Sequence, residues 1–166
     1  MQAGILSDTH GTVHPRILDF FSDVDEIWHA GDIGSAALLR SLQAFKRVRA
    51  VFGNIDGQEV RQECSLIEYF EAGAILVMMT HIGGYPGHYQ PEIRKIIDVK
   101  RPKLFISGHS HILKVMYDKK YGLLHINPGA AGNSGLHRSV TAVKLVIDGN
   151  EIRDLRVLDL PRQRAV

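Results

Sequence analysis

Short apolar runs alternate with segments of helical spacing over the first two thirds of the chain, and this alternation strongly limits the folds that it can adopt. The runs with the length and apolar content of strands are 4–6, 26–30, 48–52, 66–70, 74–79 and 103–107. The intervening segments whose apolar residues recur with the period of a helix are 15–21, 36–42 and 91–99. Strands that alternate with helices predict an α/β fold in which helices cover a sheet.

After residue 111 the pattern changes to strands alone. Two pairs of runs, 113–117 with 123–127 and 139–147 with 152–158, flank short turn sequences. The second turn is Asp148-Gly149-Asn150, and Asp-Gly readily adopts the positive φ of a tight hairpin. We find no repeat, linker or low-complexity segment, so we expect a single domain over 1–166 with two packed sheets and helices outside them.

Composition and charge exclude several classes of protein. The 166 residues are 45% hydrophobic and 23% charged, which is typical of an ordinary globular domain and not of a disordered chain. The net charge of +2, with scattered Lys and Arg, argues against bulk nucleic-acid binding. The single cysteine, Cys64, excludes an internal disulfide and a cysteine zinc cage. Neither a leader sequence nor a span of ~20 apolar residues is found, so we expect a cytoplasmic protein without membrane contact.

Polar residues follow the apolar runs at the points where strands are expected to end. Seven residues share this position: Asp8, His10, Asp32, Asn54, His81, His109 and His111. In α/β sheets the carboxyl ends of the strands form the edge where ligands bind. Residues two apart on an extended backbone point the same way, so we expect Asp8 to project beside His10, and His109 beside His111.

The chemistry of this set indicates metal. It comprises two carboxylates, one amide oxygen and four imidazoles, a donor set that transition metals accept. Seven donors exceed what one ion takes while keeping a position open for water, so they suit two ions that share a carboxylate. Two cations roughly 3.5–4 Å apart activate a bound water and clamp phosphate oxygens, which is the chemistry of phosphate-ester hydrolysis. Any one of these residues alone is more often a polar group in a loop, so the inference depends on the whole set.

The order of these motifs resembles the calcineurin-like metallophosphoesterases. The matching motifs are Asp8-x-His10, Gly31-Asp32, Gly53-Asn54, His81 and Gly108-His109-x-His111. The closing Asn127-Pro128-Gly129 is similar to the compact bacterial and archaeal phosphodiesterase branch, which includes the scaffold subunit of eukaryotic retromer. The resemblance covers about 4–158 and implies a four-layer αββα sandwich of two mixed β-sheets flanked by helices.

The resemblance also implies roles for the residues. Asp8, His10 and His111 would hold one metal ion, Asn54, His81 and His109 the other, and Asp32 would bridge them. Asp32, Asn54 and His81 would serve catalysis, with a metal-bridging hydroxide attacking a small phosphodiester. The cofactors would be two divalent transition-metal ions, with manganese as the first expectation and zinc, iron, nickel and cobalt as alternatives.

One position departs from the family pattern. The larger family has Gly-Asn-His-Asp or Gly-Asn-His-Glu where this chain has Gly53-Asn54-Ile55-Asp56. The missing histidine would protonate the leaving group, and such help is typically worth about 10²–10⁴ in rate. We therefore expect modest turnover and a preference for diesters whose leaving groups need little protonation. Asp56 is either a carboxylate that orients a ligand histidine or a turn residue.

Two other functions remain open at this stage. The chain could be a catalytically weak or inactive metal-binding interaction scaffold, or a module that binds a single metal ion. The seven ligating side chains favour the enzyme over the scaffold. Exposed apolar positions in the C-terminal hairpins leave a homodimer as an open alternative.

Overall fold

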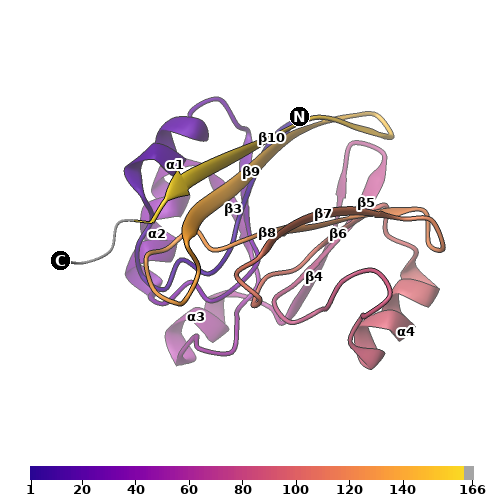
Figure 1. Cartoon of the computed structure of the whole chain (residues 1–166), viewed down its shortest axis with the longest axis horizontal. Coiled ribbons are helices and arrows are strands. Elements are labelled where there is room, and N and C mark those ends of the chain that lie inside the picture. The colour runs from indigo at the N-terminus through magenta and orange to yellow at the C-terminus, as the bar shows by residue number, and fades with distance from the viewer. Residues whose placement is uncertain (163–166) are drawn as a thin grey trace.

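Two five-stranded β-sheets form the framework of the molecule (Figure 1). The computed structural model describes residues 1–162. The first sheet has the order β10-β9-β1-β2-β3, with bounds Glu151–Pro161, Ser139–Asp148, Gln2–Leu6, Glu26–His29 and Arg47–Ala50. The second has the order β4-β5-β6-β8-β7, with bounds Ile67–Ala72, Ile75–Thr80, Leu104–Ile106, Leu123–Pro128 and Leu113–Asp118.

Both sheets are mixed, and each contains three parallel strands. In the first sheet β1, β2 and β3 run parallel, and β9 pairs antiparallel with β1. In the second sheet β5, β6 and β8 run parallel, and the hairpin strands β4 and β7 are antiparallel to their neighbours. The parallel strands therefore deliver their carboxyl ends, and the loops that follow, to one edge of each sheet.

Helices cover the outer faces, as local sequence signals predict. The helices are α1 Pro15–Phe20, α2 Ala36–Phe45, α3 Gln58–Glu63 and α4 Pro91–Lys100. Ser35 caps α2 by accepting the Leu38 N–H at 3.2 Å. Pro91 occupies the first turn of α4, where its missing N–H has no consequence, and Arg101 ends that helix in a left-handed conformation.

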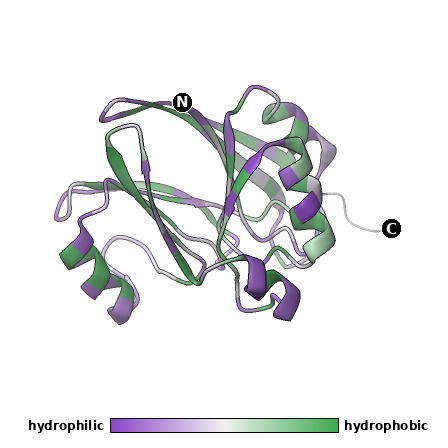
Figure 2. Cartoon of the chain, turned by 180° about the vertical axis from the view of Figure 1, so that it is seen from behind, coloured by the Kyte–Doolittle hydropathy of each residue, from purple (hydrophilic) through white to green (hydrophobic). Residues whose placement is uncertain are grey.

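Apolar side chains from both sheets form the central core. Ile5 and Trp28 of the first sheet pack in one cluster with Val77, Ile106 and Ile126 of the second. Separate clusters lie between the first sheet and α1 and α2, and between the second sheet and α4. This gives the predicted αββα layering, and Figure 2 shows green, hydrophobic stretches along the strands, interrupted by hydrophilic ones. Within residues 1–162, no helix has the length and apolar character needed to cross a membrane.

The fold differs from the sequence prediction mainly around α3. This helix was not predicted, because Val60 is its one buried residue and the sequence carries no apolar stripe to mark it. Figure 2 shows α3 as largely hydrophilic. The strand expected at 48–52 ends at Ala50, and Val51 continues only as an isolated bridge to Ser65.

Acid should destabilise the fold through a buried histidine. His125 on β8 is fully buried against Phe105, and burial lowers its pKa from 6.5 to about 4. As the pH falls below 6.5, His125 takes up a proton in the unfolded chain but not in the folded one. The free energy of unfolding is therefore highest above pH 6.5 and decreases as the pH falls to about 4, where the folded chain is protonated too. We expect His125 to account for a loss of about 3 kcal/mol over this range. Urea unfolding at several pH values measures it, and an equally steep loss in His125→Phe would contradict the assignment.

Candidate metal centre

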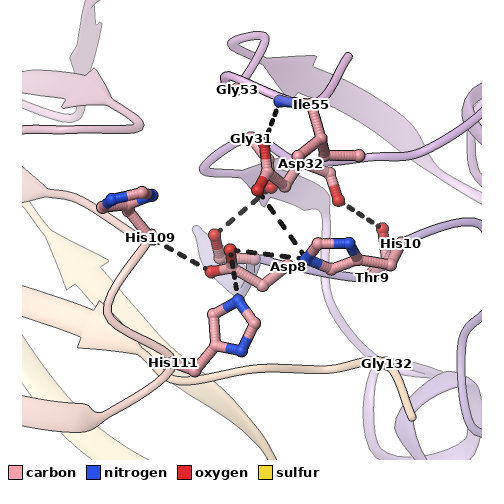
Figure 3. Close-up of polar contacts among 12 residues, drawn as sticks. Asp8, Thr9, His10, Gly31, Asp32, Gly53, Ile55, His109, His111 and Gly132 are labelled. Carbon is pink, nitrogen blue, oxygen red and sulfur yellow. Dashed lines mark hydrogen bonds and ion pairs between the residues drawn. The ribbon is translucent and has the colours of Figure 1, made fainter. Parts of the chain in front are cut away.

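Six of the seven predicted site residues meet at the carboxyl ends of the strands. They form two groups, Asp8 with His10 and His111, and Asp32 with His81 and His109. Within each group the potential ligand atoms lie within 4.8 Å of one another, so each group could hold a metal ion. Figure 3 shows Asp8 and Asp32 close together, with the rings of His10 and His111 beside Asp8.

The backbone that carries these residues is left-handed, which corrects the expectation of extended strand ends. The site residues with positive φ are Asp8 (55°), His10 (48°), Asp32 (54°), His109 (72°) and His111 (60°). They are five of the seven non-glycine residues with positive φ in the part of the chain that is described. Asp and His tolerate this region better than most residues, yet each such residue costs about 1–3 kcal/mol.

The ligand loops begin after the strands have ended, and this explains the difference. β1 ends at Leu6 and β6 at Ile106, so neither pair of ligands continues an extended strand. The turn at each residue sends His109 and His111 into different groups instead of placing them side by side. The family resemblance implied this separation, whereas the spacing of the two residues did not.

Two glycines allow the loops to approach one another. A Cβ at Gly53 would overlap the Asp32 carboxylate, and one at Gly31 would lie 2.7 Å from the ring of His81. Gly31 also has a φ of 98°. The glycines that precede Asp32 and Asn54 in the sequence motifs are therefore required by close packing of the site itself.

Each carboxylate is held by a backbone N–H on one oxygen and faces imidazoles with the other. Asp8 Oδ2 accepts the His109 N–H at 3.1 Å, and Asp32 Oδ1 accepts the Ile55 N–H at 3.1 Å. Asp8 Oδ1 lies 3.2 Å from His111 Nε2 and 3.8 Å from His81 Nε2. Asp32 Oδ2 lies 3.2 Å from His81 Nε2 and 3.7 Å from His10 Nε2.

These donor atoms fit a metal. Asp8 Oδ1, His10 Nε2 and His81 Nε2 are buried and make no hydrogen bond to any residue of 1–162, which is costly for polar atoms. Two atoms bound at ~2.1 Å to one ion lie about 3.0–3.4 Å apart, close to the shorter separations found here. A cation would therefore satisfy the atoms that the protein leaves unpaired.

The same proximity shifts the pKa values of the ionisable groups. Burial alone would raise the pKa of Asp32, but the neighbouring His81 and the Ile55 N–H lower it below its ordinary value. Burial would lower the pKa of His81, but Asp32 and Asp8 raise it. For His111, the carboxylate of Asp8, 3.2 Å from His111 Nε2, is the main cause of a raised pKa. The carboxylates thus strongly favour positive charge at this position.

Hydrogen bonds to residues outside the two groups orient the rings of His81 and His111. His81 Nδ1 lies 2.8 Å from the Ala30 carbonyl oxygen, which can only accept, so the neutral ring keeps its proton on Nδ1 and leaves Nε2 to bind a metal. His137 Nε2 likewise donates to the Gly132 carbonyl at 2.8 Å. Burial lowers the pKa of His137 and favours its neutral form, whose Nδ1 is an acceptor. His111 Nδ1, 3.3 Å away, therefore donates to it and leaves Nε2 free to bind a metal.

The sequence prediction did not include His137, because it lies inside a glycine-rich loop and follows no apolar run. We expect His137→Ala to weaken metal binding by about 10–100-fold, since His111 loses the partner that fixes its ring. Calorimetric metal titration measures this effect. His88→Ala, which changes a histidine on an exposed loop, is the control that should bind metal normally. Unchanged affinity in His137→Ala would show that His111 needs no such support.

Asn54, the seventh predicted residue, carries an amide and so is not among the carboxylates and imidazoles that form the two groups. Its side chain is exposed and, together with His81, lines a cavity of about 430 Å³. Its amide makes no hydrogen bond within residues 1–162. Its role as a metal ligand stays a prediction.

Asp56 and Ile55 support the loop of Asp32. Asp56 is buried and accepts the backbone N–H groups of Ile33, Gly34 and Gly53 at 2.7–3.1 Å. It therefore holds the backbone beside Asp32 and does not orient a ligand histidine. The Ile55 side chain is 48% exposed, and its backbone N–H holds Asp32. This position offers no proton donor on its side chain.

Comparison with known families agrees with this geometry. The model of the calcineurin-like phosphoesterase superfamily domain matches residues 1–150. The chain therefore belongs to the calcineurin-like phosphoesterases.

Two archaeal relatives are similar in sequence. A "Probable metallophosphoesterase" of Methanothermobacter thermautotrophicus is 29% identical over 137 residues, covering 78% of this chain and 77% of the relative. A second "Probable metallophosphoesterase", from Methanocaldococcus jannaschii, is 31% identical over 136 residues, which cover 78% of this chain and 68% of the relative. Together with the family match, these relatives identify the chain as a metallophosphoesterase by family and by the names of its homologues.

Solved structures share the fold. Vps29 from Entamoeba histolytica, complexed with Zn²⁺, has a TM-score of 0.76 at 17% identity, covering 98% of this chain and 100% of that chain. A Thermotoga maritima protein has a TM-score of 0.71 at 22% identity, covering 95% and 99%. At these identities the likeness shows a common α/β architecture of two mixed sheets.

Proposed function

We propose that this protein is a dinuclear metal-dependent phosphodiesterase. The observation that carries the proposal is the pair of adjoining Asp/His groups, in which three buried ligand atoms make no hydrogen bond among the described residues. Asp8, His10 and His111 hold one ion in this proposal, and Asn54, His81 and His109 hold the other. Asp32 is shared, in agreement with the positions of His10 and His81 within 3.7 Å of its Oδ2 atom.

Each residue of the two groups has a role that follows from its position. When bound, a pair of such ions lowers the pKa of coordinated water and neutralises charge on phosphate oxygens. Asp8 and Asp32 supply the negative charge that attracts both cations and, held by backbone N–H groups, fix where the cations lie. His81 and His111 present Nε2 because their Nδ1 atoms are engaged elsewhere.

The substrate preference follows from Ile55. No side-chain proton donor stands at this position, so the leaving group must depart without protonation from it. Esters with good leaving groups, such as activated aryl diesters, suit this arrangement better than esters with poor ones. The mixed nitrogen and oxygen donor set accepts manganese, our first expectation, and also zinc, iron, nickel and cobalt.

Metal reconstitution tests this function. We expect metal-free protein to hydrolyse neither bis(4-nitrophenyl) phosphate nor 4-nitrophenyl phosphate, and Mn²⁺ to restore hydrolysis of the diester preferentially. A parallel series with Zn²⁺, Fe²⁺, Ni²⁺ and Co²⁺, and a screen of cyclic nucleotides, define the metal and the ester class. Undiminished activity in the presence of a strong chelator would contradict the proposal.

The scaffold alternative gives a different result in the same assay. Ile55 favours the scaffold over a rapid enzyme, because the histidine that would donate a proton in the larger family is absent from this position. A protein that binds two ions per chain but hydrolyses no ester in the screen would be a metal-binding scaffold. One ion per chain would indicate a mononuclear module instead.

A further inference from the structure

A second cavity adjoins the candidate metal centre on the side of His109. It lies between the glycine-rich loop at 82–90 and the outer face of the second sheet, and it has a volume of about 260 Å³. Pockets that enclose whole small ligands typically have about 300–1,000 Å³, so this one suits a single group of a larger molecule. Since His109 belongs to both sites, a substrate bound at the metal centre can extend into this cavity.

The cavity is rich in donors and has no acidic wall. Among the described residues that line it, none is Asp or Glu. Lys114 supplies a positive charge, and its Nζ lies 3.6 Å from the centre of the Tyr85 ring, which fixes the ammonium at the wall. Lys114 forms no ion pair within residues 1–162. The charge of Lys114 is therefore available to an anion.

Two further side chains offer hydrogen bonds. The Ser110 hydroxyl oxygen accepts the Asn127 amide at 3.0 Å and the Ile112 N–H at 3.2 Å, so its own proton remains free to donate. His125 lines the cavity and is fully buried, and neither of its ring nitrogens makes a hydrogen bond of good geometry within residues 1–162. An unpaired buried imidazole is costly, and a ligand in the cavity would satisfy it.

We propose that this cavity, formed by Lys114, Ser110 and His125 beside His109, is a subsite for a second anionic group of the substrate. A phosphate fits best, because an ammonium, a hydroxyl and an imidazole can each bind a different oxygen of it. The substrate class is then a phosphodiester that carries a further phosphate on one of its two alcohols. This inference rests on the proposed phosphodiesterase function. It adds that one of the two alcohols of the substrate carries a phosphate.

Three matched esters test the subsite. They are the 2-(phosphonooxy)ethyl (called 2-phosphoethyl below), 2-carboxyethyl and 2-methoxyethyl diesters of 4-nitrophenyl phosphate. In each, water adds to phosphorus, the bond to the aryl oxygen breaks, 4-nitrophenolate leaves and a proton passes to solvent. Because the leaving group is constant, we expect kcat to vary little, and KM of the 2-phosphoethyl ester to be at least about tenfold below that of the 2-methoxyethyl ester.

Variants assign the effect to the cavity. Lys114→Met should raise KM of the 2-phosphoethyl ester to that of the 2-methoxyethyl ester, and Lys119→Met, on the exposed turn after β7, should keep the native difference. Equal KM values for the three esters in the native protein would overturn the proposal. A preference for the 2-carboxyethyl ester alone would overturn the assignment to phosphate.

A binding measurement separates this inference from the proposed function. If the metal-loaded protein hydrolyses none of the three esters, the phosphodiesterase proposal fails, and the subsite is still tested in metal-free protein. Titration with inorganic phosphate should shift the ring resonances of His125 in the native chain and require at least about tenfold more phosphate in Lys114→Met. Resonances that phosphate does not move would overturn the subsite.

Discussion

Asp32→Ala is expected to lower kcat/KM for an activated aryl phosphodiester by about a thousandfold or more. The reason is that one oxygen of Asp32 lies near Nε2 of both His10 and His81, at 3.7 and 3.2 Å, so both groups of ligands depend on it. We expect metal analysis to show fewer than two ions per chain in this variant. Steady-state kinetics with the metal-reconstituted protein measures the loss of activity.

Asp19→Ala provides the matched control, because Asp19 is an exposed aspartate on α1. It should retain native activity and native metal content. Circular dichroism should show that both variants fold. Native activity in Asp32→Ala would mean that the shared carboxylate has no part in the reaction.

Asp56→Ala is expected to lower the free energy of unfolding by about 3–5 kcal/mol. The substitution leaves three backbone N–H groups without their acceptor, those of Ile33, Gly34 and Gly53. Two of these residues directly follow Asp32, so the metal affinity should fall together with the stability. Urea unfolding and calorimetric metal titration measure the two effects.

Two further variants serve as comparisons for this prediction. Asp56→Asn keeps one accepting oxygen and should lie between the native protein and Asp56→Ala in stability. Asp98→Ala, at an exposed position on α4, should unfold like the native chain. If Asp56→Ala were as stable as Asp98→Ala, the buried carboxylate would not hold the loop of Asp32.

The layers of the fold could be predicted because the central strands are buried on both faces. Strands such as β5 read as nearly continuous apolar runs, and helices such as α2 carry both an N-cap serine and a buried stripe. The helix α3 was not predicted, because Val60 is its one buried residue and the other residues of the helix are polar. Where packing imposes no pattern on the sequence, periodicity cannot reveal an element.

The site could be predicted in part, because strand ends are marked by glycine followed by a ligating residue. The sequence could not show that the ligand loops are left-handed, since positive φ at Asp8 or His109 results from tertiary contacts. It also could not show the partner of His111, because His137 lies 26 residues away and no local pattern marks it. The hydrogen bonds of Asp56 to the backbone of Ile33 and Gly34 are likewise long-range and leave no sequence signal.

The most direct test is anomalous diffraction from crystals of the metal-reconstituted protein, recorded at the absorption edge of the bound metal. Our account predicts two peaks roughly 3.5–4 Å apart. One peak should lie beside Asp8, His10 and His111, the other beside His81 and His109, with Asp32 between them. A single peak, or peaks remote from Asp32, would contradict the dinuclear centre from which the proposed function is argued.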